Sequence, residues 1–327
     1  NDVIICLTDD DKLNLLVALL AKHLGVPKTF VRVGRLEYIT LMEQVGIDVV
    51  FSPRLLTSGQ ILRLIREGEN LINISTFEGS KAEAIEISIT NRSNLMNQYL
   101  KETQMLDFSN PSIQKLIEMK CWKEKNKFDC IKAIYNFVRD DIVFGYNVDD
   151  NIPASKVLKD GYGQCNTKGT LFMALLRACK IPCRIHGFTI DKQLQKGAMS
   201  GFVYKNAPKN IFHSWVEVYF EDKWYELEAF ILDKKYLYKL QKRFANCTGF
   251  FCGYGVAVKD FQHPIIDFDR NNTYIQSEGI TKDFGVYDSP DELLKNHHQE
   301  LSGIKTFLYR HLGRHLMNWN VKNIRNS

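Results

Sequence analysis

Residues 161–184 read GYGQCNTKGTLFMALLRACKIPCR, and this stretch decides the fold of the larger part of the chain. Gly161 and Gly163 interrupt regular structure just before Cys165. Apolar residues then follow at helical spacing until Ile181-Pro182 stops the pattern. Cys165 is therefore expected at the N-terminus of a buried helix. The helix dipole and the free backbone N–H groups there favour a thiolate and can hold an oxyanion.

Two strands are predicted downstream. Residues 212–220 alternate between apolar and polar, which places His213 and Trp215 on one face. After a turn at 221–223, residues 224–228 return as the paired strand, and Glu226 and Glu228 share a face near the start of the first strand. A cysteine nucleophile needs a base, and a carboxylate can orient that base. The order cysteine helix, histidine strand, acid strand thus indicates nucleophilic catalysis.

These segments resemble the transglutaminase-like family of papain-type cysteine enzymes. The matching stretches are GYGQC at 161–165, LRACKIPCR at 176–184, HSWVEVY at 213–219 and WYELE at 224–228. The resemblance covers about residues 110–235. It implies that Cys165 is the nucleophile, His213 the general base and acid, and Glu228 the orienting acid. The family usually has Asp at this last position, so Glu226 remains an alternative.

The resemblance also implies acyl transfer on amide or peptide bonds through a thioester acyl-enzyme. Water would resolve the thioester by hydrolysis, as in a peptidase or amidase, and an amine would resolve it by crosslinking; hydrolysis is favoured. Gln164 either helps to polarise the oxyanion or caps the loop, and Trp215 is expected to pack beside the site. A protein or peptide is the expected substrate.

The first 90 residues show a different pattern, in which short apolar strands alternate with amphipathic helices. This alternation predicts right-handed crossovers and a parallel sheet. The first helix is expected to be capped by Thr8 or Asp9. The expected elements are strands at 3–7, 29–33, 49–52 and 71–77, and helices from the cap to about 23, at 37–45 and at 57–67.

This part resembles the nucleotide-binding domain of Trk-type potassium-uptake regulators, through CLTDDDKLN at 6–14, VRV at 31–33, GID at 46–48 and SP at 52–53. It matches only the later half of that domain. The Gly-x-Gly-x-x-Gly phosphate turn belongs to the earlier half, so the chain is expected to begin inside the domain and to bind no NAD or ATP there. No cofactor is predicted.

The sequence therefore predicts an α/β half-Rossmann module with a parallel sheet at 1–90, and an α+β papain-like, transglutaminase-like catalytic domain at 95–240. A C-terminal extension at 241–327 is expected to be loop-rich and then helical, with a helix at about 291–317 that packs on the catalytic domain; a basic amphipathic surface helix is the alternative. Residues 1–90 hold 9 basic and 12 acidic residues, whereas residues 91–327 hold 34 and 26. This opposition of charge supports a boundary near residues 90–95.

Composition limits the partners and the compartment. A net charge of +5 is too mild to argue for nucleic acid, and no apolar run is long enough to span a bilayer, so membrane contact would be peripheral at most. Eight cysteines in 327 residues suggest reduced thiols in a cytoplasmic protein. No metal site is predicted from their spacing. The alternative to an enzyme is a non-catalytic regulatory or binding protein, in which residues 1–90 form a homo-oligomer or dock to a potassium-transport assembly.

Overall fold

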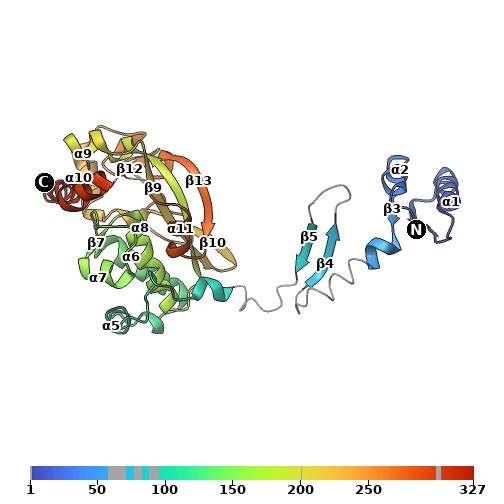
Figure 1. Ribbon diagram of the computed structural model, residues 1–327, viewed down its shortest axis with the longest axis horizontal. Helices are drawn as coiled ribbons and strands as arrows, with labels where there is room; N and C mark the ends of the chain where they lie inside the picture. The colour runs from blue at the N-terminus through green and yellow to red at the C-terminus, as the bar shows by residue number, and fades with distance from the viewer. Residues whose placement is uncertain (1, 58–70, 77–82, 88–95, 200, 300–302) are drawn as a thin grey trace. The chain divides into compact units, whose positions relative to one another are not determined.

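The computed structural model describes residues 2–57, 71–76, 83–87, 96–199, 201–299 and 303–327. The chain divides into two compact units, residues 1–92 and residues 93–327. The first unit is a small α/β module and the second is an α+β domain, as predicted (Figure 1).

The first unit is built on a parallel sheet of three strands in the order β1–β2–β3. One helix follows β1 and another follows β2, which confirms the predicted alternation. Asp10 caps the first helix, one residue beyond the predicted cap, because the Thr8 hydroxyl donates to Asn14 instead. The elements are β1 (Val3–Cys6), α1 (Asp11–His23), β2 (Lys28–Arg32), α2 (Tyr38–Gln44) and β3 (Val49–Phe51).

The prediction of a further parallel strand at 71–77 is wrong in its pairing. β4 (Leu71–Thr76) pairs antiparallel with β5 (Glu83–Ile87), in a sheet of two strands. The short connection between the two strands suits an antiparallel pair, since a parallel pair would need a crossover of a dozen residues or more. The helix predicted at 57–67 lies outside the described residues, apart from its first residue.

The second unit centres on an antiparallel sheet in the order β10–β9–β8–β13 (Figure 1). Its strands are β8 (Cys183–Asp191), β9 (Asn210–Phe220), β10 (Lys223–Leu227) and β13 (Ile280–Tyr287). The predicted pair of strands is present: Trp224 lies opposite Tyr219, and Leu227 opposite Val216. The helix α8 (Cys165–Ala178) packs against β9.

The buried helix α8 fills the centre of this unit. Every residue from Asn166 to Arg177 is buried, including the charged side chains of Lys168 and Arg177. A Cβ added at Gly169 would meet Val216 at 3.5 Å, which is an ordinary van der Waals contact, so α8 lies directly against the sheet at this point. The other helices of this unit are α5 (Pro111–Met119), α6 (Lys127–Asp140), α7 (Ala154–Asp160), α9 (Gly201–Asn206), α10 (Lys234–Arg243), α11 (Pro290–Asn296), α12 (Gly303–Leu308) and α13 (Arg314–Asn326). Short strand pairs are formed by β6 (Val143–Phe144) with β7 (Tyr162–Gly163) and by β11 (Phe251–Gly253) with β12 (Val256–Val258).

Residues 241–327 belong to the second unit. β13 forms the edge of the main sheet by pairing with β8. Arg325 in α13 donates to Asp233 at 2.7 Å, and Asp233 also accepts the Phe144 N–H at 3.0 Å. The predicted helix at 291–317 is in fact α11, α12, a π-helical turn at Tyr309–Gly313 and the start of α13.

Candidate active site

Cys165 is the first residue of α8, and its thiol is half-buried. The two glycines before it have separate tasks. Gly161 ends α7 with a φ of 69°, a left-handed conformation that glycine adopts without strain. A Cβ on Gly163 would lie 2.7 Å from the Thr167 hydroxyl, so only glycine fits against the first turn of the helix. Together the two glycines place the Cys165 thiol at the N-terminus of α8, where the first backbone N–H groups have no partner within the helix.

His213 lies in β9 and is completely buried. Its Nε2 is 2.7 Å from Oε1 of Glu228. Its Nδ1 has no hydrogen-bond partner among the described residues, and the Cys165 thiol is close enough to act on the ring. Burial lowers the pKa of His213, but Cys165 and then Glu228 outweigh burial and raise it to about 10. The imidazole therefore stands between a thiol and a carboxylate and favours its charged form at neutral pH.

Glu228 follows the last residue of β10 and is also completely buried. Its Oε2 accepts the backbone N–H groups of Ile275 at 2.7 Å and Gln276 at 2.8 Å, while Oε1 faces His213. These three hydrogen bonds fix both oxygens of the carboxylate. The Glu228 side chain, which is longer than that of Asp, thus reaches the His213 ring, and two backbone N–H groups hold its carboxylate in place.

Glu226 has a different environment. It lies opposite Glu217 in the strand pair, and its Oε2 accepts the Tyr274 hydroxyl and, at 3.5 Å, the Asn272 side chain. The structure brings Glu228, and not Glu226, to the ring of His213.

Gln164 and Trp215 both lie near Cys165 and His213 in the sequence, but their side chains are engaged elsewhere. The Gln164 side chain accepts from the Asn147 N–H at 2.8 Å and donates to Asp150 at 2.8 Å. Trp215 packs on Phe188 with ring centres 4.1 Å apart. Its indole N–H has no hydrogen-bond partner among the described residues. Gln164 holds the loop before α8, and Trp215 packs among aromatic rings, with His186 5.3 Å and Phe188 4.1 Å away between ring centres.

A hydrogen-bonded chain that sequence reasoning missed joins the neighbours of Cys165 to the neighbour of His213. Asp150 accepts from Gln164 at 2.8 Å and from Asn166 at 2.9 Å, the residues on either side of Cys165. Asn166 in turn accepts the Ser214 hydroxyl at 2.8 Å. This chain fixes the start of α8 relative to β9. Adjacency to Cys165 and His213 was the only signal in the sequence that could have found it.

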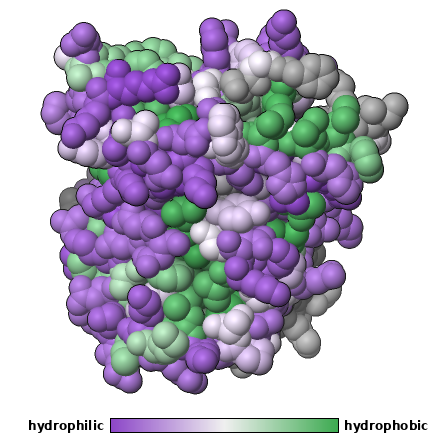
Figure 2. Space-filling view, turned by 90° about the vertical axis from the view of Figure 1, so that its left-hand side faces the viewer, coloured by the Kyte–Doolittle hydropathy of each residue, from purple (hydrophilic) through white to green (hydrophobic). Residues whose placement is uncertain are grey.

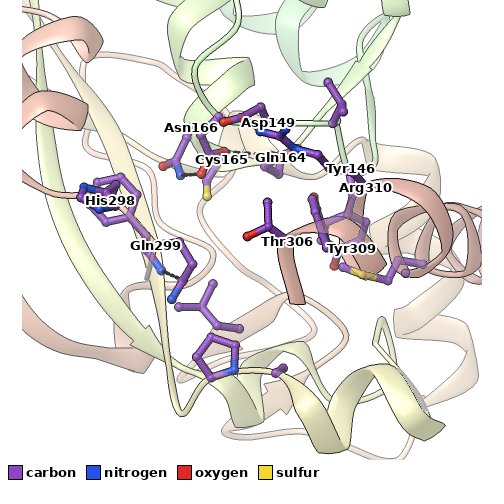
Figure 3. Close-up of a pocket in the computed structure, with 18 of the residues that line it drawn as sticks. Tyr146, Asp149, Gln164, Cys165, Asn166, His298, Gln299, Thr306, Tyr309 and Arg310 are labelled. Carbon is purple, nitrogen blue, oxygen red and sulfur yellow. Dashed lines mark hydrogen bonds and ion pairs between the residues drawn. The ribbon is translucent and has the colours of Figure 1, made fainter. Parts of the chain in front are cut away.

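A pocket of about 660 Å³ opens beside Cys165. Figure 3 shows the Cys165 sulfur pointing into a space bordered on the other side by the helical segment that carries Thr306 and Tyr309. Asn166, His298 and Gln299 also line the pocket. The thiol is thus accessible to a bound molecule while His213 and Glu228 remain shielded from water.

Comparison with known proteins confirms both resemblances. Residues 117–229 match the family model of the transglutaminase-like superfamily, and residues 1–53 match that of the TrkA-N domain. Cys165, His213 and Glu228 all fall within the first match. The fold is therefore a partial Rossmann-like module followed by a papain-like, transglutaminase-like domain.

Individual relatives cover only parts of the chain. The Trk system potassium uptake protein TrkA homolog 2 of Methanosarcina mazei is 41% identical over 101 residues, which are 31% of this chain and 22% of that protein. A structure from Cytophaga hutchinsonii assigned as a cysteine protease is 14% identical, covering 61% of this chain and 49% of that one, with a TM-score of 0.36. Red sea bream transglutaminase is 18% identical over 41% of this chain and 26% of that one, with a TM-score of 0.24.

Across the described ranges, no group of three or more His, Cys, Asp or Glu side chains is arranged to hold a metal ion. In the same part of the chain, no helix combines the length and the apolar character needed to cross a membrane.

Proposed function

We propose that the second unit is a cysteine-dependent enzyme that transfers acyl groups from amide or peptide bonds, with hydrolysis favoured over crosslinking. The observation that carries this proposal is the arrangement around His213. Its Nε2 is held by the buried carboxylate of Glu228, and its ring interacts with a thiol that opens on a pocket. A structural cysteine needs none of these features, whereas nucleophilic catalysis needs all of them.

In this mechanism His213 takes the proton of the Cys165 thiol, and the thiolate attacks the carbonyl carbon of the amide. The N–H groups at the start of α8 stabilise the oxyanion that forms. The C–N bond then breaks as His213 returns its proton to the leaving amine, which leaves a thioester on Cys165. Water, deprotonated by His213, attacks the thioester; the C–O bond forms, the C–S bond breaks and the thiol recovers its proton. Glu228 holds the ring orientation and stabilises its charge throughout.

Hydrolysis is favoured because water needs no binding site of its own, whereas crosslinking requires a bound amine as well as a bound amide. Mass spectrometry of the protein mixed with glutamine-containing peptides tests the proposal. We expect an acyl adduct on Cys165 that disappears in water and is absent from Cys165→Ala, together with free acid or cleaved peptide. Cys6→Ala, at a buried cysteine of the first unit, is the matched control and should retain the adduct. Absence of any adduct or product across a broad peptide set would contradict the proposal.

The first unit supports a second, separate role as an association module. Large apolar side chains on α1 and directly after it remain exposed, among them Leu16 at 65% and Leu24 at 73%. Such side chains suit contact with a protein surface, either another copy of the chain or a potassium-transport assembly. Light scattering over a range of concentrations tests this role. If the unmodified protein has a mass above that of one chain, Leu16→Asp should lower it. A single-chain mass for the unmodified protein at all concentrations would exclude self-association.

The free state of all eight cysteines supports the expectation of a cytoplasmic, reducing compartment.

A further inference from the structure

The pocket beside Cys165 has one wall that the mechanism does not use. Leu308, Leu312 and Leu316, spaced four residues apart, all line it. They are 41%, 53% and 48% exposed, respectively, although each sits on a helical segment that buries other residues in the core. Leucines left half-exposed in a concave site are characteristic of a surface that binds an apolar partner.

The opposite side of the pocket is also largely apolar. Ile211 and Phe212 of β9 line it, together with Met199 and Val203 from the segment before that strand. Phe212 directly precedes His213, so this apolar lining reaches the reacting groups. Figure 2 shows apolar surface between hydrophilic margins on the side of the molecule where α9 and the C-terminus lie in Figure 1.

The leucine-bearing wall is fixed to the loop that precedes Cys165. The Tyr309 hydroxyl donates to the Asn147 carbonyl at 2.9 Å, and Arg310 pairs with Asp149. Further along, the Asn318 side chain accepts the Tyr146 N–H at 2.7 Å and donates to the Tyr146 carbonyl at 3.0 Å. The wall is therefore preorganised at the nucleophile, which reduces the cost of ordering it when a substrate binds.

The acidic side chains of the pocket already have partners. Asp149 pairs with Arg310, and Asp150 accepts from the two residues that flank Cys165. Asp291 accepts from the Thr103 hydroxyl and from the Met105 N–H. At the rim, Lys295 and His298 are exposed, where a single charge contact in water contributes little. Among the lining side chains, the apolar wall therefore offers a substrate more than the charged groups do.

We propose that this pocket binds the acyl donor through apolar side chains that flank the reacting amide, so that the substrate class is an apolar peptide segment. The proposal rests on the function proposed above, because the pocket contains the nucleophile. Leu312 and Leu316 are then specificity-determining residues, since they contact the substrate away from the reacting carbonyl.

A pair of fluorescent peptides of equal length and charge tests this proposal. Each carries one glutamine, flanked in one peptide by leucine and valine and in the other by serine and asparagine. Binding to Cys165→Ala is measured by fluorescence anisotropy, and turnover is measured separately on the protein with its cysteine. We expect the apolar peptide to bind about tenfold or more tightly than the polar one, because apolar area leaves water on both sides of the interface.

The variant Leu312→Asp, or independently Leu316→Asp, should remove most of that preference while leaving the binding of the polar peptide within about twofold. Phe307→Asp and Trp319→Asp are the matched controls, because both residues are exposed on the same segment but do not line the pocket. Circular dichroism checks that each variant is folded.

Equal affinity for the two peptides, or an equal loss in the pocket variants and the controls, would overturn the proposal. Turnover tests the reaction independently of binding. A clear binding preference without product or acyl adduct would contradict the proposed function but would still support the apolar binding site.

Discussion

The two units of this chain differ in the polar side chains that they bury. In the first unit the buried polar residues serve the backbone: the Asn14 side chain donates to the Thr8 and Arg32 carbonyls, for example. Large apolar side chains stay outside, as Leu16 and Leu24 do. In the second unit the charged pair His213 and Glu228 is completely buried.

This difference separates two kinds of function. Burying a charged pair is costly unless each member is paired and hydrogen-bonded, so a buried His–Glu pair beside a thiol has a chemical use that offsets its cost. Exposed apolar side chains on a small module indicate a binding function instead, because they suit contacts with other surfaces. We therefore expect substitutions of polar residues to affect activity only in the second unit.

The largest expected effect comes from Glu228→Gln, which keeps the size of the side chain and removes its charge. Loss of the charge should favour the wrong tautomer of His213 and lower kcat by roughly 10²- to 10⁴-fold, as loss of the orienting acid does in other triads. Asp48→Asn in the first unit, where the carboxylate accepts from the Thr29 N–H and hydroxyl, should leave kcat within about twofold.

Glu226→Gln refines this test inside the second unit. Because Glu226 bonds to Tyr274 rather than His213, its loss should cost activity much less than loss of Glu228. Steady-state kinetics on the same peptide substrate provide the measurement. Equal effects of Glu226→Gln and Glu228→Gln would show that neither carboxylate has a special relation to the ring.

How much of this could be predicted from sequence depends on how local each feature is. The position of Cys165 followed from two glycines and an apolar run, and the partner strands of His213 followed from alternation and a turn. The family resemblance favoured Glu228, but Glu226 stayed open as an alternative, because Ile275 and Gln276, which hold Glu228, come from a segment without any motif. The antiparallel pairing of β4 with β5 could not be predicted either, because an apolar strand has the same sequence pattern in a parallel and in an antiparallel sheet.

The particular contacts of residues 241–327 could not be predicted from the sequence. Arg325 reaches Asp233 across more than ninety positions, and β13 joins the sheet through hydrogen bonds to β8. Contacts over such distances leave no local pattern of spacing. The same holds for the leucine-bearing wall of the pocket: the helical spacing of Leu308, Leu312 and Leu316 is visible in the sequence, but the pocket that they line is not.

A further prediction concerns the stability of each unit. Met42→Ala in the first core and Leu171→Ala in the second remove completely or almost completely buried side chains and should each cost about 2–5 kcal/mol of unfolding free energy. All four tryptophans, Trp122, Trp215, Trp224 and Trp319, lie in the second unit. Tryptophan fluorescence during urea unfolding should therefore shift in Leu171→Ala and stay unchanged in Met42→Ala.

Far-UV circular dichroism, which reports on both units, should reveal the loss in Met42→Ala. If Met42→Ala shifted the fluorescence transition as much as Leu171→Ala does, the two hydrophobic cores would not be independent.

The pH dependence of stability provides a further test of the second unit. The pKa of His213 rises from 6.5 to about 10 on folding, although burial alone would lower it, because Cys165 and Glu228 favour the charged ring. A raised pKa gives stability that is fully present below pH 6.5 and is lost as the pH rises to about 10. Urea unfolding followed by tryptophan fluorescence should show this decline, and His213→Gln should flatten it. An unchanged decline in His213→Gln would assign it to other groups.

The central claim is that His213 activates the Cys165 thiol, and iodoacetamide labelling across pH tests it most directly. The account predicts that Cys165 is labelled selectively below pH 7, faster than the exposed Cys121 and Cys252, and that His213→Ala abolishes this selectivity. Mass spectrometry of tryptic peptides identifies the labelled residue. If Cys165 instead reacted no faster than Cys121 below pH 7, or equally fast with and without His213, the claim of an activated thiol would be contradicted.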